Sequence, residues 1–560
     1  MSRTVTGTGA TPLSDVGTVR WYRPDESLPE TTDAGTPEEE RANFEDAKET
    51  AREEIEAERE RTRDLVGEDE AGVFDAHLQF LADPQIEASV EDGIDDGLAA
   101  TAAVREAFAD PIAQFESMDG MMAERADDLR DVRNRLVRIL AGSERIDLSA
   151  LPAGTILLAE RLTPSDTAQL DPSRVAGFAT VEGGRTSHAA IFARSLGIPA
   201  VVGAGAGIED IQEGTEVVID GNAGEIIVDP DEAVRADAAS GRDVEIHTDA
   251  VETTDGVSIE VAANVGTPAE IESAVEHGAD GIGLFRTEFL FFNRESPPSE
   301  DEQYEAIAET LSAFPDGRVV VRTLDIGGDK PIPYLDQAPE ENPFLGERGI
   351  RRSLDSDADL FRTQLRALMR AAASEHGDGL SVMFPLVSTV DELDRALEAV
   401  DEVAADLEEA GVEWARPEFG VMVETPSAVF MAEELATRVD FFSIGTNDLT
   451  QYVMATSREN DRISYLHDPR HPAVLRAIHR IVQVGHEHDC WVGMCGEMAG
   501  DPTLLKLLVG LGLDELSMSA ITIPDVKAGV AATSHADAAT LASDALAATT
   551  ISDITQLLNQ

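Results

Sequence analysis

The sequence predicts a multidomain α/β protein, in which an α/β domain with an inserted helical bundle precedes a (β/α)8 barrel of the TIM type. Eight short apolar runs recur over residues 251–560 with helical stretches between them. Such alternation over about 250–300 residues is typical of this barrel. A charged helical pattern over 24–142 separates two strand-containing segments, 1–23 and 143–228, which we expect to fold as one domain.

The expected barrel strands are 257–265, 281–288, 319–325, 380–385, 419–425, 441–445, 492–497 and 513–519. Several of them end in polar residues, and barrel active sites form at the C-terminal ends of the strands. The acidic segment 229–250 has a mixed pattern, so we expect a linker there that is partly helical. The barrel then occupies residues 251–560.

The composition is strongly acidic. Against 43 Lys and Arg residues stand 109 Asp and Glu residues, which gives a formal net charge of −66. The acidic residues are spread along the chain and 42% of all residues are hydrophobic, so we interpret them as a halophilic surface rather than a disordered tail. Mutual repulsion then destabilises the fold at low salt. Nucleic-acid binding is excluded because phosphates would be repelled.

The sequence also indicates a compartment. Cys490 and Cys495 are the only cysteines, which favours a reducing environment over a disulfide-bonded fold. The N-terminal residues lack the apolar stretch of a signal peptide, and no run of about 18 apolar residues occurs. We therefore expect a cytoplasmic protein without membrane insertion.

One histidine follows a glycine pair and two hydroxyl residues, in the segment GGRTSHAAIFAR that begins at Gly183. Thr186 or Ser187 can cap the helix that starts there, which leaves first-turn N–H groups free for an anion. His188 at that position can accept a phosphoryl group, because a helix N-terminus stabilises negative charge. Taken alone, the motif also fits a capped helix with an incidental histidine.

Arginines collect near the ends of the expected barrel strands. Arg286 and Arg322 end the second and third strands, and Arg348 and Arg458 lie in loops. Guanidinium groups bind carboxylates and phosphates in a bidentate manner, so this set suits a ligand that carries both groups. A single arginine is more often a solvated surface residue, and the prediction depends on their shared position.

Three further residues at strand ends suggest chemistry. Glu424 and Asp448 supply hard oxygen ligands from neighbouring strands, which suits Mg²⁺ completed by substrate oxygens. Cys495 is a candidate proton donor to carbon, if its surroundings adjust its pKa. A lone cysteine of this kind is more often a small core residue.

The longer motifs resemble Enzyme I of the phosphoenolpyruvate-dependent phosphotransferase system. Besides the His188 segment they are LTPSDTAQL at 162–170, GLFRTEFL at 283–290, RTLDIGGDK at 322–330, SIGTNDLTQY at 443–452 and GMCGE at 493–497. The resemblance covers essentially the whole chain in the order expected of this family. It is weakest over 24–142, and residues 9–14 lack the glycine that usually follows the proline in this family.

The resemblance implies a role for each matched residue. His188 would be phosphorylated, with Thr167 hydrogen-bonded to its imidazole or phosphate, and Cys495 would protonate the enolate to give pyruvate. The residues implied to bind phosphoenolpyruvate are Arg286, Arg322, Arg348, Asn447 and Arg458. Those implied to hold Mg²⁺ are Glu424 and Asp448, and those implied to support the site are Lys330 and Glu497.

The resemblance also implies partners. In the family the helical region docks the small carrier protein HPr, and the barrel dimerises. Residues 24–142 would therefore bind HPr, and residues 1–23 with 143–228 would form the phosphohistidine domain that moves about the linker. The final phosphoryl acceptor, such as a fructose permease or a dihydroxyacetone kinase system, cannot be distinguished from the sequence.

Two alternatives are open, one within the same superfamily and one of a different class. A nucleotide-dependent pyruvate dikinase or phosphoenolpyruvate synthase needs an additional nucleotide-binding domain, and the sequence contains no Gly-x-x-x-x-Gly-Lys-Ser/Thr motif. A non-catalytic phospho-relay scaffold would have lost barrel residues. The complete set of Arg, Glu, Asp and Cys residues argues against that reading.

Overall fold

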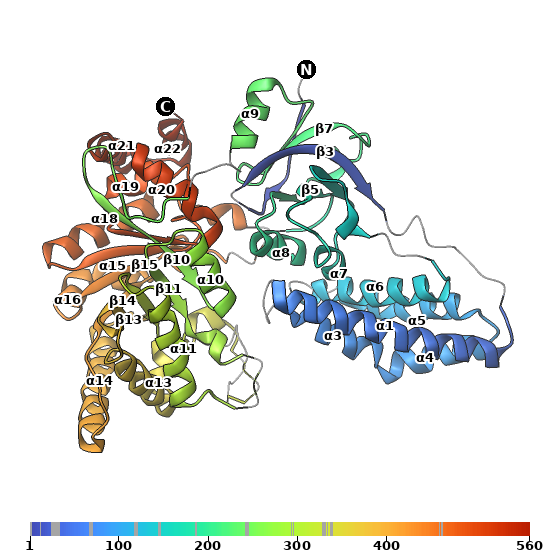
Figure 1. Ribbon diagram of the computed structural model, residues 1–560, viewed down its shortest axis with the longest axis horizontal. Helices are drawn as coiled ribbons and strands as arrows, with labels where there is room; N and C mark the ends of the chain where they lie inside the picture. Colours follow the sequence, from blue (N-terminus) through green and yellow to red (C-terminus); the bar gives the residue numbers. More distant parts are fainter. Residues whose placement is uncertain are drawn as a thin grey trace. The chain divides into compact units, whose positions relative to one another are not determined.

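The computed structural model divides the chain into two compact units, Met1–Asp243 and Val244–Gln560 (Figure 1). The residues that the structure describes are 3–11, 13–23, 34–65, 71–116, 121–143, 147–184, 187–240, 246–292, 294, 296–327, 332, 334–335, 340–457, 460 and 463–559. No helix among them is long and apolar enough to cross a membrane.

The first unit is built on an eight-stranded sheet with the order β1-β8-β7-β3-β4-β5-β6-β2. Its strands are β1 (Arg3–Thr6), β2 (Thr8–Gly9), β3 (Ser14–Tyr22), β4 (Thr155–Ala159), β5 (Val175–Thr180), β6 (Ala200–Val202), β7 (Glu216–Asp220) and β8 (Glu225–Val228). Strand β3 pairs with β4 in parallel and with β7 antiparallel. The strands before and after the helical region therefore share one sheet, which makes that region an insertion.

The inserted region is a helical bundle. Its helices are α1 (Pro37–Leu65), α3 (Val73–Leu81), α4 (Pro84–Asp95), α5 (Ala100–Glu116) and α6 (Met121–Leu140). Apolar residues at helical spacing, among them Phe74, Phe108 and Leu129, form its buried core. The expected helical character of this region is confirmed.

A buried arginine joins the bundle to the sheet domain. Arg135 of α6 is buried and donates to Glu54 at 2.9 Å and to Glu58 at 2.6 Å, both on α1. The same guanidinium donates to Ser165 Oγ of α7 (Pro164–Thr167) at 2.7 Å. One buried arginine thus fixes two bundle helices against the short helix α7.

The described parts of the expected linker, 229–250, lie against one unit or the other. Helix α9 (Glu232–Ser240) packs on β3 and β7 of the first unit. In the second unit, Lys527 Nζ donates to the main-chain oxygens of His247 and Asp249 at 3.1 and 3.0 Å. The segment is therefore more structured than its mixed sequence pattern suggested.

The second unit is a closed barrel of eight parallel strands. They are β10 (Ser258–Val265), β11 (Ile282–Arg286), β12 (Val319–Arg322), β13 (Leu380–Phe384), β14 (Glu418–Val423), β15 (Phe441–Gly445), β16 (Trp491–Cys495) and β17 (Glu515–Met518). Neighbours pair in chain order, and β10 pairs with both β17 and β11, which closes the ring. All eight strands lie within the expected apolar runs or begin one residue before them, so the predicted barrel is confirmed.

Helices lie around the barrel and connect each strand to the next along the chain (Figure 1). They are α10 (Pro268–Glu276), α11 (Glu300–Ala313), α12 (Ile350–Leu354), α13 (Ala358–Ala371), α14 (Val390–Ala410), α15 (Pro426–Phe430), α16 (Ala432–Ala436), α17 (Thr446–Met454), α18 (Pro472–Glu487), α19 (Leu505–Leu511), α20 (Ile523–Ala532), α21 (His535–Ala547) and α22 (Ile551–Leu558). Thr267, Ser299 and Thr389 open three of them with capping boxes. The strands are buried on both faces, as expected for a parallel sheet covered by helices.

Candidate functional site

His188 is the first residue of helix α8 (His188–Leu196) in the first unit. Ser187 is the N-cap residue, but its Oγ donates to the Gly184 carbonyl oxygen at 2.8 Å and makes no capping bond. The first-turn N–H groups are therefore not engaged by this side chain. The other expected cap, Thr186, lies outside the described residues.

Thr167 lies at the end of α7, which packs against α8. Its side chain is fully buried, and Oγ1 donates to the carbonyl oxygens of Thr163 and Pro164 at 3.1 and 3.0 Å. A Thr163–Asp166 capping box begins the helix, and Tyr22 Oη donates to Asp166 Oδ1 at 2.6 Å. The Thr167 hydroxyl proton is thus engaged by main chain, which leaves its lone pairs to face an imidazole N–H. Its bond to His188 stays a prediction.

In the second unit, two buried arginines meet around Asp325 at the C-terminal ends of the strands. Arg322 Nη2 donates to Glu288 Oε1 at 2.9 Å, and its Nη1 lies 3.2 Å from Asp325 Oδ2. Arg348 forks onto Asp325 through Nε at 3.1 Å and Nη2 at 3.0 Å. Nη2 also donates to Asp448 at 2.9 Å. Two of the predicted substrate ligands are therefore held in one network.

Neighbouring charges keep both guanidinium groups ionised. Burial by itself lowers the pKa of Arg348, but Asp325 and Asp448 more than reverse this and raise it. The pKa of Arg322 is raised in the same way, because Glu288 and Asp325 outweigh its burial. Both side chains therefore present fixed positive charge inside the barrel mouth.

Unused N–H groups on three arginines indicate an anionic ligand. Arg286 Nε, Arg322 Nε and Arg348 Nη1 are buried and have no hydrogen-bond partner within the described residues. Arg286 and Arg322 are in register at the ends of adjacent strands, so their side chains share one face. Buried donors left without a partner carry a desolvation cost, which a bound carboxylate or phosphate would offset.

Glu424 is held in place by the neighbouring loop. The N–H of Leu386 donates to Glu424 Oε1 at 2.7 Å, and Leu386 adopts a left-handed φ of 56° that non-glycine residues rarely use. Such strain is typical of functional sites. A Cβ on Gly445 would lie 2.7 Å from Glu424 Oε2, so the glycine leaves room for this carboxylate.

The two expected metal ligands, Glu424 and Asp448, are buried and affect one another electrostatically. Burial, and then the charges of Asp448 and Asp325, raise the pKa of Glu424 to about 8. Asp448 Oδ1 is buried and has no hydrogen-bond partner within the described residues. These carboxylates fit Mg²⁺, which typically takes one or two protein carboxylates and completes its shell with substrate phosphate and water. No cluster of three His, Cys, Asp or Glu residues able to hold a metal occurs in the described parts of the chain.

Cys495 ends β16 and faces the barrel interior beside Met422 and Phe441. Its Sγ lies 3.6 Å from the main-chain oxygen of Ile444. Burial raises the pKa of this thiol to about 12. The thiol therefore keeps its proton at neutral pH and gives it up only to a strong base, such as an enolate carbon.

Three of the remaining predicted residues, Arg286, Asn447 and Glu497, lie in the described part of the chain. The Arg286 guanidinium lies 5.5 Å from the ring centre of Phe289. Asn447 is the second residue of α17, and its main-chain oxygen contacts His467 Nε2 at 2.9 Å. Glu497 follows Cys495 and is exposed. Arg458 and Lys330 lie outside the described residues.

Sequence reasoning gave no role to Glu288 and Asp325, although both are almost fully buried and position the arginines. The sequence did contain one signal for them. Each lies at the end of an expected strand, two or three residues after an arginine. In an acidic chain such positions do not stand out. Their burial, which the sequence did not reveal, distinguishes them from the surface carboxylates.

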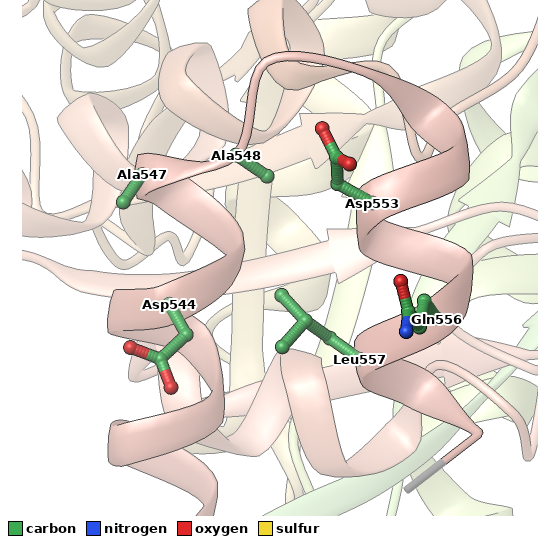
Figure 2. Close-up of a pocket in the computed structure, with 6 residues that line it drawn as sticks. All are labelled: Asp544, Ala547, Ala548, Asp553, Gln556 and Leu557. Atoms are coloured by element: carbon green, nitrogen blue, oxygen red, sulfur yellow. The ribbon is translucent and has the colours of Figure 1, made fainter.

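A shallow pocket of about 370 Å³ lies elsewhere on the second unit, between α21 and α22 (Figure 2). Its lining residues are Asp544, Ala547, Ala548, Asp553, Gln556 and Leu557. None of the candidate site residues touches it. The pocket contains two carboxylates and no basic side chain, so it does not suit an anionic substrate.

Comparison with known proteins defines the class. Sequence profiles described as PEP-utilising enzyme match three parts of the chain: the N-terminal profile at residues 6–125, the mobile-domain profile at 151–224 and the PEP-binding-domain profile at 241–535. The chain belongs to the family of PEP-utilising enzymes. This confirms the family that the sequence motifs indicated.

Individual relatives narrow the class further. A phosphoenolpyruvate-protein phosphotransferase of Haloferax volcanii is 64% identical over 558 residues, which is 99% of both chains. One of the same name from Priestia megaterium is 45% identical over 508 residues, 89% of this chain and 88% of the relative. A solution structure of an Enzyme I protein (nEIt) is 40% identical, covers 42% of this chain and 97% of its own, and has a TM-score of 0.36.

Proposed function

We propose that this protein is a phosphoenolpyruvate–protein phosphotransferase, which moves the phosphoryl group of phosphoenolpyruvate to His188 and then to a histidine of the carrier HPr. The observation that carries the proposal is the barrel network, in which Arg322 and Arg348 share Asp325 and each retains an N–H with no partner among the described residues. The names of near-full-length relatives support the same activity.

The substrate carries a carboxylate and a phosphate, and the arginines provide donors for both. Arg322 and Arg348 are held by carboxylates, so little reorganisation is needed when the anion binds. Glu424 and Asp448 would hold Mg²⁺, which supplies positive charge against the phosphate and the developing enolate. Each of these groups lies at the C-terminal end of the strands, where barrel enzymes place their chemistry.

Transfer then needs a neutral imidazole in line with the phosphorus. A nitrogen of His188 forms the new bond to phosphorus while the bond to the enolic oxygen breaks, which releases the enolate. The Cys495 thiol donates its proton to C3 of the enolate and leaves pyruvate and a thiolate. The first-turn N–H groups of α8, which Ser187 does not cap, suit the charge of the phosphorylated histidine.

The partners form part of the proposal. HPr docks on the helical bundle, the protein acts as a homodimer through the barrel, and it works in the cytoplasm. Cys495 is a free cysteine, as a proton donor must be, and a reducing compartment keeps it so. A halophilic HPr with matching surface residues is the expected acceptor.

The test is incubation of the purified protein with phosphoenolpyruvate and Mg²⁺ in high salt, without nucleotide. We expect one acid-labile phosphoryl group on His188 by intact mass and peptide mapping, together with one pyruvate. His188→Ala abolishes labelling, while binding of phosphoenolpyruvate to the barrel, measured by calorimetry, changes less than about twofold. Labelling that requires ATP would instead indicate the dikinase alternative, and labelling of the His188→Ala variant would refute the assignment of this residue.

A further inference from the structure

A second polar group lies inside the barrel, and the proposed reaction does not use it. Glu515 of β17 is only 1% exposed. It pairs in register with Gly493 of β16, while Ser517 pairs with Cys495. Residues in register on parallel strands, and residues two apart on one strand, share a face. Glu515 therefore faces the same interior as Cys495, one step nearer the N-terminal end of the strands.

Two glycines make the space for this carboxyl group. A Cβ on Gly283 of β11 would lie 2.4 Å from Glu515 Oε1, and a Cβ on Gly493 would lie 3.0 Å from it. The carboxyl thus extends across the interior between two other strands. Oε2 is buried without a hydrogen-bond partner in the described part of the chain, and Arg318 Nη1 lies 3.9 Å away.

The same carboxyl is connected to the solvent at the N-terminal end of the barrel. Glu260 of β10 pairs in register with Glu515, and Arg318 Nη1 donates to Glu260 Oε2 at 2.9 Å. The side chains of Arg318 and Glu260 are 29% and 24% exposed. The Arg318 guanidinium lies 3.8 Å from the ring centre of Trp491, whose ring stacks on that of Phe441.

Burial, reinforced by the charge of Glu260, keeps the Glu515 carboxyl protonated at neutral pH. Burial, and then the charge of Glu260, raise the pKa of Glu515 to about 8, with Arg318 acting in the opposite direction and Asp514 adding a smaller increase. Burial also raises the pKa of Glu260, against the effect of Arg318. Around Cys495, the charges of Glu424 and Glu515 add to burial and that of Arg322 opposes it. A protonated Glu515 is therefore a stronger acid than the thiol.

We propose that Glu515 returns a proton to the Cys495 thiolate after each turnover. It does not touch the substrate and acts only through the thiol. The inference rests on the proposed function, because it begins with the thiolate left by enolate protonation. A proton leaves the Glu515 carboxyl and forms the S–H bond, which leaves a carboxylate beside Arg318. Glu260 and solvent at the N-terminal end then restore the proton. Ser443 is in register with Gly493, and its hydroxyl interacts with the Cys495 thiol and lowers the pKa of that thiol.

The test compares two exchange rates in one experiment. The full-length protein, phosphoenolpyruvate, Mg²⁺ and labelled pyruvate are mixed in D₂O. Exchange of label between pyruvate and phosphoenolpyruvate measures turnover of the carbon skeleton, and deuterium at C3 measures renewal of the Cys495 proton from solvent. A merely structural change slows both rates together and leaves their ratio unchanged.

In the wild-type protein we expect about one deuterium incorporated at C3 per exchange of the carbon label. In Glu515→Gln we expect this ratio of deuterium incorporation to carbon exchange to be at least tenfold lower, because the thiol is not renewed from solvent and returns the same proton. Glu515→Asp restores part of the ratio. Glu418→Gln is the matched control: Glu418 also lies at the N-terminal end of the strands but bonds to Trp491 and Ser381. Its ratio stays at the wild-type value.

The pH profile gives an independent check. In the wild-type protein the ratio falls as pH rises through the pKa of Glu515, because only the protonated carboxyl donates, and in Glu515→Gln this limb is absent. If Glu515→Gln is inactive, Glu260→Gln, which interrupts the same path, must lower the ratio. A wild-type ratio in these variants overturns the relay. Absence of carbon exchange in the wild-type protein refutes the proposed function instead.

Discussion

At the scale of single residues, the site depends on groups that position the arginines proposed to bind the substrate. Asp325 is fully buried and binds both Arg322 and Arg348, while Asp448 shares Arg348 with it. With Glu288, which pairs with Arg322, five charged groups are buried together here. They are stable only because each charge has a partner of opposite sign. Binding therefore begins from arginines that are already oriented, which lowers the entropic cost of ordering them.

The Arg348→Lys variant tests this arrangement. Lysine keeps the charge but has no fork, so it cannot hold both oxygens of Asp325 and also reach Asp448. Loss of about two charge-assisted hydrogen bonds, roughly 1.5–3 kcal/mol each, predicts at least a hundredfold lower kcat/KM for phosphoenolpyruvate.

The control for this variant is Arg351→Lys. Arg351 lies three residues further along the chain, in helix α12, and it donates to the main chain of Gly346 and to Ser388 Oγ. We expect its kcat/KM for phosphoenolpyruvate to stay within threefold of the wild-type value when both variants are assayed by the rate of pyruvate release. Equal losses in the two variants would show that Arg348 has no special part in binding.

Single residues also differ in how far the sequence alone indicates them. His188, Cys495, Glu424 and the arginines are visible because their types are unusual at strand or helix ends. Glu515 was not visible, since it is one of 109 acidic residues and only its burial beneath Cys495 distinguishes it. Burial of a single carboxylate depends on glycines of other strands, and a pattern along one strand does not contain that information.

At the scale of elements, prediction succeeded where hydrophobic period and length agree. The barrel strands are short apolar runs between amphipathic helices, so their positions follow from the sequence. The eight-stranded sheet of the first unit was less predictable, because β3 joins strands from both sides of the bundle. Helix α9 was assigned to a linker because its sequence is acidic, whereas packing on β3 and β7 fixes it.

The approach to α8 depends on two glycines that lie close together. Gly203 follows β6 with a φ of 64°, and a Cβ there would lie 2.5 Å from the carbonyl oxygen of Gly183. Gly183, with a φ of 124°, belongs to the loop that leads to His188. This close approach of two backbones therefore holds the loop in position.

The Gly203→Ala variant should displace that loop. Alanine costs roughly 1–2 kcal/mol in left-handed backbone and adds a clash of about 1–3 kcal/mol. We expect slower labelling of His188 and a lower Tm of the first unit, with unchanged affinity of the barrel for phosphoenolpyruvate. Gly214→Ala is the matched control, since its φ is 81° and its Cβ meets no atom within 4 Å. If both variants label equally slowly, backbone strain alone is responsible and the contact has no role.

At the scale of the whole molecule, charge is the dominant feature. Acidic residues outnumber basic ones by 109 to 43. Even if every basic residue formed an ion pair, the formal net charge of −66 would stay. Of the lysines in the described residues, Lys48 and Lys527 are buried in ion pairs. The surface is therefore left with an excess of carboxylates, which repel one another in dilute salt.

This excess predicts a steep dependence of stability on salt. The Debye length falls from about 10 Å at 0.1 M to about 3 Å at 1 M, so added KCl removes most repulsion between surface carboxylates. We expect the Tm of both units to rise by more than about 10 °C between 0.2 and 2 M KCl, measured by calorimetry. Sucrose at matched osmolality stabilises through exclusion without screening, so it should produce a much smaller rise. An equal rise in sucrose would show that screening is not the cause, and a flat KCl series would mean that the acidic surface does not limit stability.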